Sequence, residues 1–364
     1  MTIRTHTAIP RPHRAGRTAL AASVLAMLAA CGGGGGGTPD DGTSQPLAIT
    51  TTNRDLVAQT TASAVMGVGS GLGAVPLSAT GPDRARQAEA AALAASPRGG
   101  LLPPAVQHWV RQELQRDRGE GMKRALAVIG PTPVACTNGG NAVVTFDDAD
   151  NNGDLSASDT LTMRFNACVE VPGAAVNGQL TMSITSYTAL PLLRATGRMT
   201  MAGLGATTAD GTVSVDGTVG FDMAELDSNT ERMTITAQTP LTTTYSAGAQ
   251  STTVSLATGY QEINQTEHQV QLPGSNTLTG RNTLSFGGNL SAPVLGGQLG
   301  VATTSPLVQY DTDSYPRSGV VTVQGRGSTL RMTVQSTSQV LLELDADGNG
   351  SFEHSSVVTW AWLL

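Results

Sequence analysis

The sequence predicts a mainly β protein in which a large curved antiparallel sheet, or an open barrel, follows two to four N-terminal helices. Two regions of different periodicity support this prediction. Over residues 49–131 apolar side chains recur at helical spacings, whereas over residues 132–364 they alternate with threonine and serine at a period of two. Asp-Gly and Pro-Gly dipeptides divide the second region into short runs, so we expect roughly 12 to 16 strands in an antiparallel meander.

Residues 1–30 have the composition of an export signal, which takes no part in the fold. Four arginines and no acidic residue form a basic start, and a short apolar run extends from Ala19 to Ala30. This run is too short to span a bilayer. The sequence therefore predicts export, with the folded protein beginning beyond residue 30.

The end of this signal, Leu28-Ala29-Ala30-Cys31, resembles the lipobox of bacterial lipoproteins. The resemblance implies cleavage before Cys31 and attachment of palmitate-type acyl chains to that cysteine, each buried CH₂ adding about 0.8 kcal/mol of membrane affinity. Gly32, where no aspartate stands, is similar to the pattern sent to the outer membrane. The expected location is the cell envelope, as an outer membrane lipoprotein facing the periplasm or the exterior. The alternative is an ordinary secretory signal with a chance cysteine.

Residues 31–48 read as a tether. Six consecutive glycines from Gly32 to Gly37 precede a stretch of Thr, Pro, Asp, Gly and Ser that lacks the apolar content needed to pack. We expect it to act as a spacer that lets the folded domain lie at a distance from the bilayer. The tether and the lipobox together resemble the proteobacterial lipoproteins with a poly-glycine tether, whose roles are largely uncharacterised.

The helical region, residues 49–131, contains several segments with recognisable ends. Thr51 or Thr52 is placed to cap the first, and a run of alternating glycines ends it. The second is rich in alanine, whose small side chain permits close packing, and the third starts with prolines, which suit a first helical turn. The expected segments are about Asn53–Met66, about Asp83–Ala95, one from Pro103-Pro104, and residues 122–129.

The β region, residues 132–364, alternates most clearly at Leu180, Met182 and Ile184, which are separated by hydroxyl residues. A membrane-spanning barrel is the less favoured form of this region, because it requires aromatic girdles at two interfaces. The whole chain has only 5 Phe, 5 Tyr and 3 Trp. Further strands are expected around Val213–Met223, Met233–Ile235, Val254–Leu256, Val321–Val323 and Leu341–Leu344.

Three cysteines occur, and their positions predict a disulfide. If Cys31 carries lipid, Cys136 and Cys168 remain in an exported protein, where oxidation is the rule. They bracket two short apolar runs with an acidic loop between them, as at the base of a β-hairpin. The rival reading, a catalytic or metal-binding cysteine, lacks a Cys-x-x-Cys pair or a nearby histidine.

The acidic loop between these cysteines has the spacing of a calcium loop. Oxygen-bearing side chains at alternate positions of a tight turn converge on a hard cation, and Gly153 permits the turn. The final position is an aspartate and no helices flank the loop, so it resembles the dockerin type more than a sensor EF-hand. The alternative is a solvated acidic turn. The expected ligands are Asp148, Asp150, Asn152, Asp154 and Asp159.

A second acidic loop near the end of the chain repeats the beginning of this pattern. Asp345, Asp347 and Asn349 occupy the first three ligand positions and Glu353 the next, but Ser356 falls where the last carboxylate belongs. An Asn-Gly turn between two strands explains the same residues. We expect calcium to be the cofactor of the first loop and a candidate for the second.

Charge and missing motifs narrow the function. Without the signal the chain has 17 basic against 28 acidic residues, a balance suited to cations and unsuited to nucleic acid. It has no Gly-x-Ser-x-Gly elbow, no His-Glu-x-x-His and no phosphate loop, so we expect no enzyme. Of the histidines only His108, His268 and His354 follow the signal; His108 lies beside Trp109 on a predicted helix, His268 lies in a polar strand or turn, and His354 adjoins Glu353 in the second acidic loop.

The expected function is a lipid-anchored cell-envelope protein whose calcium- and disulfide-stabilised β domain has a structural or interaction role. Its partners would be the membrane, through the N-terminal lipid, and an envelope protein or glycan. The alternative is a binding module or carrier for a lipid or other apolar ligand in the concave face of the sheet. A curved sheet of this length encloses space that either the helices of residues 53–95 or a ligand must fill.

Overall fold

The structure is a computed structural model, and it describes residues 45–71, 129–152, 156–169, 173–188, 191–208, 211–247 and 250–364. All of these belong to one compact unit that begins at Gly42. The predicted signal, most of the tether, and the predicted helices beyond residue 71 lie outside the described residues.

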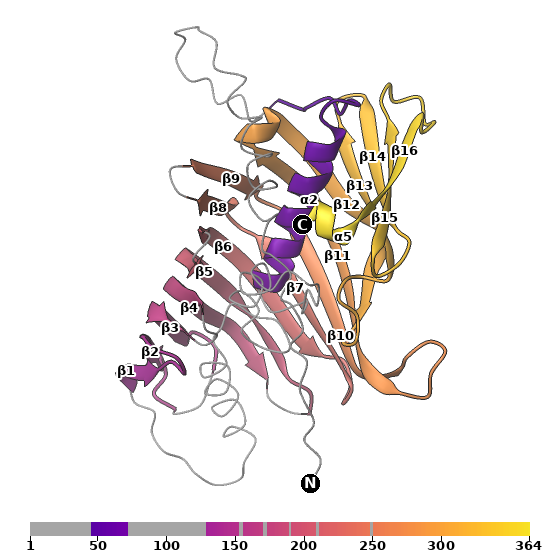
Figure 1. The fold of residues 1–364 in the computed structure, drawn as a ribbon. Helices are drawn as coiled ribbons and strands as arrows, with labels where there is room; N and C mark the ends of the chain where they lie inside the picture. The colour runs from indigo at the N-terminus through magenta and orange to yellow at the C-terminus, as the bar shows by residue number, and fades with distance from the viewer. Residues whose placement is uncertain are drawn as a thin grey trace, which may run out of the picture. The chain divides into compact units, whose positions relative to one another are not determined.

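The described chain is mainly β, as predicted, and its sixteen strands form one antiparallel sheet (Figure 1). The strands are β1 (Ile129–Ala135), β2 (Asn141–Asp147), β3 (Thr160–Cys168), β4 (Ala174–Thr188), β5 (Arg194–Thr208), β6 (Thr212–Glu225), β7 (Thr230–Ala237), β8 (Leu241–Ala247), β9 (Gln250–Leu256), β10 (Gln261–Gln271), β11 (Leu278–Ala292), β12 (Gly297–Tyr310), β13 (Ser318–Gly325), β14 (Ser328–Val334), β15 (Gln339–Asp345) and β16 (His354–Thr359). The helices are α2 (Arg54–Gly71), a 3-10 turn η3 (Pro293–Leu295) and α5 (Trp360–Leu363).

The sheet follows the chain from one edge to the other as a meander. β7 and β8 both pair with β6, end to end, and β10 and β9 likewise share β11. Each of these two pairs therefore behaves as one long strand with an interruption. Within the described residues β1 and β16 each pair with a single neighbour, so the open form of the sheet is the observed one and the barrel is not closed.

A line of β-bulges crosses the sheet from strand to strand. On β4 and β5 the ladder shifts register at Gly178 and at Gly203, and these glycines face each other with backbone φ angles of +98° and +54°. The Gly203 amide donates to the Asp216 carboxylate on β6 at 2.7 Å. The next residue, Gly217, has a φ of +140° and lies against the break at Pro240, between β7 and β8.

The same line continues through the second half of the sheet. Gly259, in the break between β9 and β10, donates to the Ala237 carbonyl, and Tyr260 lies so close to Gly288 of β11 that a Cβ there would stand 2.7 Å from the Tyr260 Cα. Further shifts follow on β12, and Gly319 of β13 faces them. Because a bulge bends its strand and increases the twist, a row of bulges bends the whole sheet along one line. We call this line the crease.

Helix α2 packs on the apolar face of the sheet. Val57, Ala58, Ala62 and Val65 are buried in the same cluster as the inward residues of the strands. The helix contacts β9, β11, β14 and the short helix α5, beside which it lies in Figure 1. Its Gln59 Nε2 donates to the Trp362 carbonyl at 2.9 Å. One predicted helix therefore fills part of the space that the curved sheet encloses.

The segment before α2 is also tied to the sheet. Pro46 forms a parallel bridge with Gln298 of β12, and the Ile49 amide donates to the Ser328 Oγ of β14 at 2.7 Å. Asn53, predicted as the first helical residue, instead accepts from the Thr50 amide at 2.8 Å, and the helix begins at Arg54. No helix among the described residues has both the length and the apolar character needed to cross a bilayer.

The first strand begins earlier than predicted. β1 starts at Ile129, ahead of the predicted boundary at residue 132, and it contains Pro131 and Pro133. Proline is tolerated on an edge strand because its missing N–H faces away from the ladder. β1 is such an edge, and it pairs only with β2.

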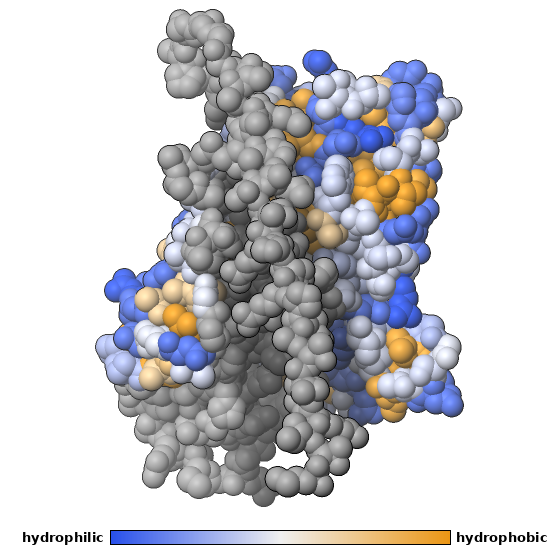
Figure 2. Space-filling model, in the orientation of Figure 1, coloured by the Kyte–Doolittle hydropathy of each residue, from blue (hydrophilic) through white to orange (hydrophobic). Residues whose placement is uncertain are grey.

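The surface is polar, as the alternation predicted. Cross-strand hydroxyl pairs recur on the strands, among them Thr200 with Thr218 at 3.2 Å and Thr244 with Thr253 at 3.3 Å. Such pairs stabilise neighbouring strands modestly. In Figure 2 the visible described surface is mostly hydrophilic, with small separate hydrophobic patches. The exposed large apolar side chains of the described residues are Leu226, Leu278, Val357 and Leu364.

Alanine substitutions at two neighbouring glycines of the crease, Gly178 and Gly203, are expected to destabilise the protein by different amounts. Gly203→Ala is expected to cost about 1–2 kcal/mol of unfolding free energy, the strain of a left-handed alanine in open space. Gly178→Ala is expected to cost at least about 2 kcal/mol more, because its Cβ would stand 2.1 Å from the Gly203 carbonyl oxygen. Urea denaturation of the two variants measures the difference, and equal midpoints would contradict the crease as described.

Candidate metal centres and the disulfide

The first acidic loop connects β2 to β3 and brings three of the predicted ligands together. Asp148, Asp150 and Asp159 each offer a carboxylate oxygen, and these oxygens all lie within 4.8 Å of one another. Asp148 and Asp159 are 2% and 0% exposed, whereas Asp150 is exposed. Three carboxylates this close repel each other unless a proton or a cation intervenes, and two of them are shielded from water.

Hydrogen bonds from residues of the loop fix two of these carboxylates, Asp159 and Asp150. Asp159 accepts from the amides of Ala149 at 2.9 Å and Ser156 at 2.6 Å, one on each of its oxygens. Asp150 accepts from the Asn152 amide at 3.1 Å and from the Ser156 hydroxyl at 3.1 Å. Desolvation opposes ionisation of Asp150, but these hydrogen bonds outweigh it and lower the pKa of that carboxyl. Hydrogen bonds within the loop therefore hold Asp150 and Asp159 in place and favour the ionised form of Asp150.

The two remaining predicted ligands of this loop are Asn152, which lies beside the carboxylates, and Asp154. The Asn152 side-chain amide donates to Asp150 at 2.8 Å, so its nitrogen is turned toward the cluster, and its oxygen is the atom that would serve a cation. Asp154 lies outside the described residues, with Gly153 and Leu155. The C-terminal end of the loop is held by the sheet, since the Ser158 amide donates to the Ile184 carbonyl of β4 at 2.8 Å.

The second acidic loop connects β15 to β16 and gathers Asp345, Asp347 and Glu353, again with oxygens within 4.8 Å of one another. Asp345 is buried and accepts from the amides of Gly348 at 2.7 Å and Gly350 at 3.0 Å. The two exposed carboxylates are bridged by a single side chain. Asn349 Nδ2 donates to Asp347 at 3.0 Å and to Glu353 at 3.3 Å.

The two loops are alike at their start and differ at their end. In each, a buried aspartate lies at the end of the strand, Asp148 just after β2 and Asp345 as the last residue of β15, and an exposed aspartate comes two residues later. Asp159 closes the first loop, whereas Ser356, at the corresponding place of the second, belongs to β16 and pairs with Leu342 of β15. Glu353 takes the third carboxylate position there instead. The first loop is therefore the more enclosed centre and the second the more open one.

The second loop is attached to the sheet by a contact that the sequence analysis did not predict. The Arg331 guanidinium of β14 lies 4.0 Å from the centre of the Phe352 ring and donates to Glu343 of β15 at 2.8 Å. The hydrogen bond to Glu343 raises the pKa of Arg331. A cation over an aromatic face is favourable, so this stack holds the loop against the sheet. The only sequence signal for it is a lone aromatic residue inside an acidic loop.

Both loops offer oxygen donors only, without cysteine or histidine among their grouped ligands. Oxygen sets of this kind suit hard cations such as Ca²⁺ and Mg²⁺ and do not suit zinc or copper, which prefer nitrogen and sulfur. The residues present therefore fit a hard divalent cation. In both loops the amide donors orient the carboxylates, so that binding would require little rearrangement.

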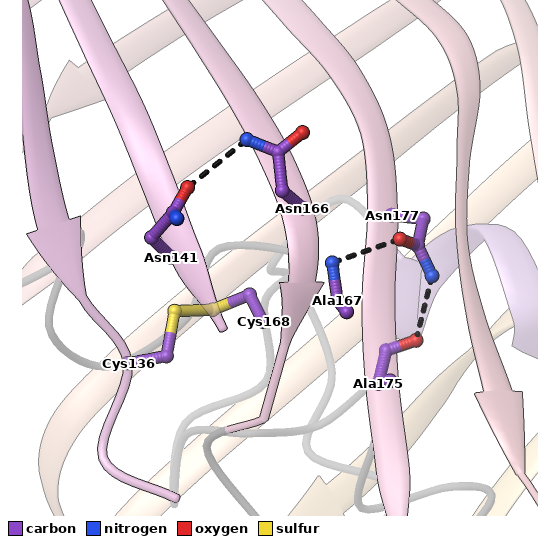
Figure 3. Close-up of a disulfide and its surroundings, with 7 residues drawn as sticks. All are labelled: Cys136, Asn141, Asn166, Ala167, Cys168, Ala175 and Asn177. Carbon is purple, nitrogen blue, oxygen red and sulfur yellow. Dashed lines mark hydrogen bonds between the residues drawn. A yellow bond between two sulfur atoms is a disulfide. The ribbon is translucent and has the colours of Figure 1, made fainter. Parts of the chain in front are cut away.

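The structure contains the predicted disulfide between Cys136 and Cys168, whose Cα atoms are 5.5 Å apart (Figure 3). It joins the end of β1 to the end of β3, on either side of β2. Beside it Asn166 Nδ2 donates to the Asn141 Oδ1 at 3.0 Å, and Asn177 of β4 accepts from the Ala167 amide at 2.9 Å. The bond and the first acidic loop thus lie at opposite ends of the β2–β3 hairpin.

Loss of this bond has a measurable cost. Replacing both Cys136 and Cys168 with serine is expected to lower the free energy of unfolding by roughly 3–4 kcal/mol, because the unfolded chain regains the freedom of the loop that the bond closes. Urea denaturation with and without reductant measures it. The serine variant serves as the control, since reductant must leave its midpoint unchanged. A wild-type midpoint that is insensitive to reductant would contradict the disulfide.

Comparison with protein-family models, with curated proteins and with solved structures finds no match to this chain.

Proposed function

We propose that this protein is a lipid-anchored cell-envelope protein whose β domain is stabilised by calcium and by a disulfide and serves a structural or interaction role. The observation that carries the proposal is the β2–β3 hairpin. It has the disulfide at one end and three convergent carboxylates at the other. Both features suit an oxidising, calcium-containing compartment outside the cytoplasm.

Calcium is the cation we propose for both loops. Their ligands are carboxylates of mixed exposure on irregular turns, and calcium tolerates irregular oxygen geometry better than magnesium does. Extracellular calcium modules bind with dissociation constants on the order of 10⁻⁴–10⁻³ M. We expect affinities in this range, with the enclosed first loop binding more tightly than the open second loop.

We propose that calcium stabilises the hairpins at the two edges of the sheet. The first loop joins β2 to β3 next to the edge strand β1, and the second joins β15 to the opposite edge strand β16. Sheet edges are the parts of a β protein that fray or pair with foreign strands. A cation in each loop would link the last residues of two strands and keep each edge hairpin closed.

Lipid anchoring rests on the lipobox resemblance at Cys31 and on the glycine-rich tether that follows it. The described chain starts at Gln45, where its carbonyl accepts from the Gln298 amide at 2.8 Å. The tether between Cys31 and this point would be long enough to separate the body from a bilayer, at up to about 3.3–3.6 Å per extended residue.

The alternative role, as carrier of a lipid or other apolar ligand, is less well supported. It requires free apolar space on the concave face of the sheet. The side chains of α2 occupy part of that face against β9, β11 and β14, with Val57 and Ala58 each 0% exposed. A structural role accounts for this packing without a ligand. We propose no catalytic role for any residue.

Calcium binding gives the first test of this proposal. At roughly a hundred times its dissociation constant, calcium should raise the free energy of unfolding by about 2.7 kcal/mol for each occupied loop. Asp148→Ala should remove the contribution of the first loop and Asp345→Ala that of the second. Thermal melts in calcium, magnesium and chelator measure these effects.

Asp227→Ala is the matched control for the calcium test. Asp227 is an exposed aspartate that accepts from the Asn229 amide in a turn without grouped carboxylates. Its variant should respond to calcium as the wild type does. Identical melting midpoints in calcium and in chelator for the wild-type protein would rule out the proposed stabilisation by calcium.

Metabolic labelling with palmitate tests the anchor. The wild-type protein should take up label and partition into the envelope fraction, whereas Cys31→Ser should lose the label and be released from the membrane. Mass spectrometry of the mature N-terminus identifies the cleavage point. An unlabelled protein cleaved elsewhere would show that the signal is an ordinary secretory one.

A further inference from the structure

Two carboxyls of the described residues lie buried outside the acidic loops, and of these Asp313 is paired with Arg317 whereas Glu262 has no cationic partner. Glu262 stands on β10 just beyond the crease and is 1% exposed. Its cross-strand neighbours are Ile235 on β7 and Phe286 on β11, both buried apolar residues. The sequence pattern does not predict the burial of this glutamate, because it occupies an inward position of a strand whose residues are otherwise mostly polar.

Among the described residues Glu262 has one polar contact, in which the Tyr260 hydroxyl donates to its Oε2 at 3.5 Å. Its Oε1 is buried, and no residue of the described chain forms a hydrogen bond to it. Burial raises the pKa of Glu262 from its ordinary 4.5 to about 8, against the small opposing effect of the Tyr260 hydrogen bond. A buried carboxylate without a cation is costly, so this group is held in its neutral form.

None of the charged groups on the neighbouring described strands forms an ion pair with Glu262. On the same inward side of β10 the next titratable residue is His268, and the Glu231 carboxylate of β7 lies 3.8 Å from its Nε2. His268 lies beyond Thr266 on β10, and Glu231 pairs with Thr266 itself, two inward positions from Glu262. On β11 Arg281 is paired with Glu267 on the other side of the sheet. On β6 the inward residue opposite Ile235 is Phe221.

Tyr260, the partner of Glu262, holds the crease together. Its carbonyl accepts from the Ala237 amide at 2.8 Å and its amide donates to the Ala257 carbonyl at 3.0 Å. Its ring stacks on Phe286 with centroids 6.4 Å apart, and its backbone fits against Gly288. One residue thus joins both interrupted strands to β11 at the place where the sheet bends.

The β8–β9 hairpin is attached to its two neighbouring strands unequally. β8 pairs with β6 from Thr242 to Ser246, whereas β9 pairs with β11 only through Leu256 with Leu290 and Ser255 with Ser291. β9 also contacts α2. Tyr260 therefore lies beside the side of the hairpin that is paired over the shorter length.

We propose that Glu262 is a proton-controlled latch: its neutral carboxyl keeps Tyr260 packed and the crease closed, and loss of its proton loosens the β8–β9 hairpin from β11 and from α2. The inference is independent of the calcium and lipid proposals, because Glu262 contacts neither acidic loop.

The direction of the pH effect follows from linkage. In the closed form Glu262 keeps its proton up to about pH 8, whereas in an open, hydrated form it would lose it near its ordinary pKa of 4.5. Between these values opening releases a proton, so the opening equilibrium rises about tenfold for each pH unit. Below about pH 4.5 and above about pH 8 the equilibrium is independent of this group.

Hydrogen–deuterium exchange of the intact mature protein tests the latch. Protection of peptides that cover 238–262, corrected for the intrinsic exchange rate, should fall about tenfold per pH unit from about pH 5 to pH 8 and then level off. Peptides of β14 and β15 should not follow this course. Glu262→Gln should abolish the pH dependence in 238–262, and Glu231→Gln, on the same side of the sheet, should retain it.

Tyr260→Phe provides a second, separable readout. It removes the one hydroxyl that favours the ionised carboxylate, so the pH at which protection levels off should move upward. A wild-type protein with constant corrected protection in 238–262 over this range would overturn the latch. So would a Glu262→Gln or Tyr260→Phe variant whose profile equals that of the wild type.

Discussion

The alignment of β-bulges into one crease is the constraint on which the rest of the structure depends. A sheet of sixteen strands with one apolar face must bend to bury that face, and a bulge is the local device that bends a strand. Here Gly178, Gly217, Gly288 and Gly319 permit close backbone approaches and Gly203 permits a left-handed φ, and together they keep the bulges in register from strand to strand. The bend brings the apolar face around α2, which completes the core.

An open sheet has two edges, and this chain reinforces the hairpin beside each. At the first edge, prolines in β1 remove donors, and the Cys136–Cys168 bond ties β1 to β3 across β2. At the second, the stack of Arg331 on Phe352 and the short helix α5 hold the last strands. An acidic loop lies in each of these edge hairpins. The proposed cations would therefore act where a meander is most easily frayed.

Two kinds of buried carboxyl coexist in this molecule, and their surroundings imply different chemistry. Asp148, Asp159 and Asp345 are grouped with other carboxylates and accept from backbone amides, an arrangement that suits a bound cation. Glu262 stands alone among apolar side chains, and its burial favours the protonated form against the opposing effect of the hydrogen bond from the Tyr260 hydroxyl. The first arrangement is suited to a response to calcium and the second to a response to pH.

The sequence by itself determined the features that depend on local pattern: the β class and its strands, the helix near residue 54, the pairing of Cys136 with Cys168, and the carboxylates grouped in each loop. Each of these is encoded within one element or between its neighbours. Only the tertiary structure decided the crease, the place of α2 and the burial of Glu262. These depend on which residues of distant strands come to lie side by side, and a period of two does not distinguish a buried inward glutamate from a solvated one.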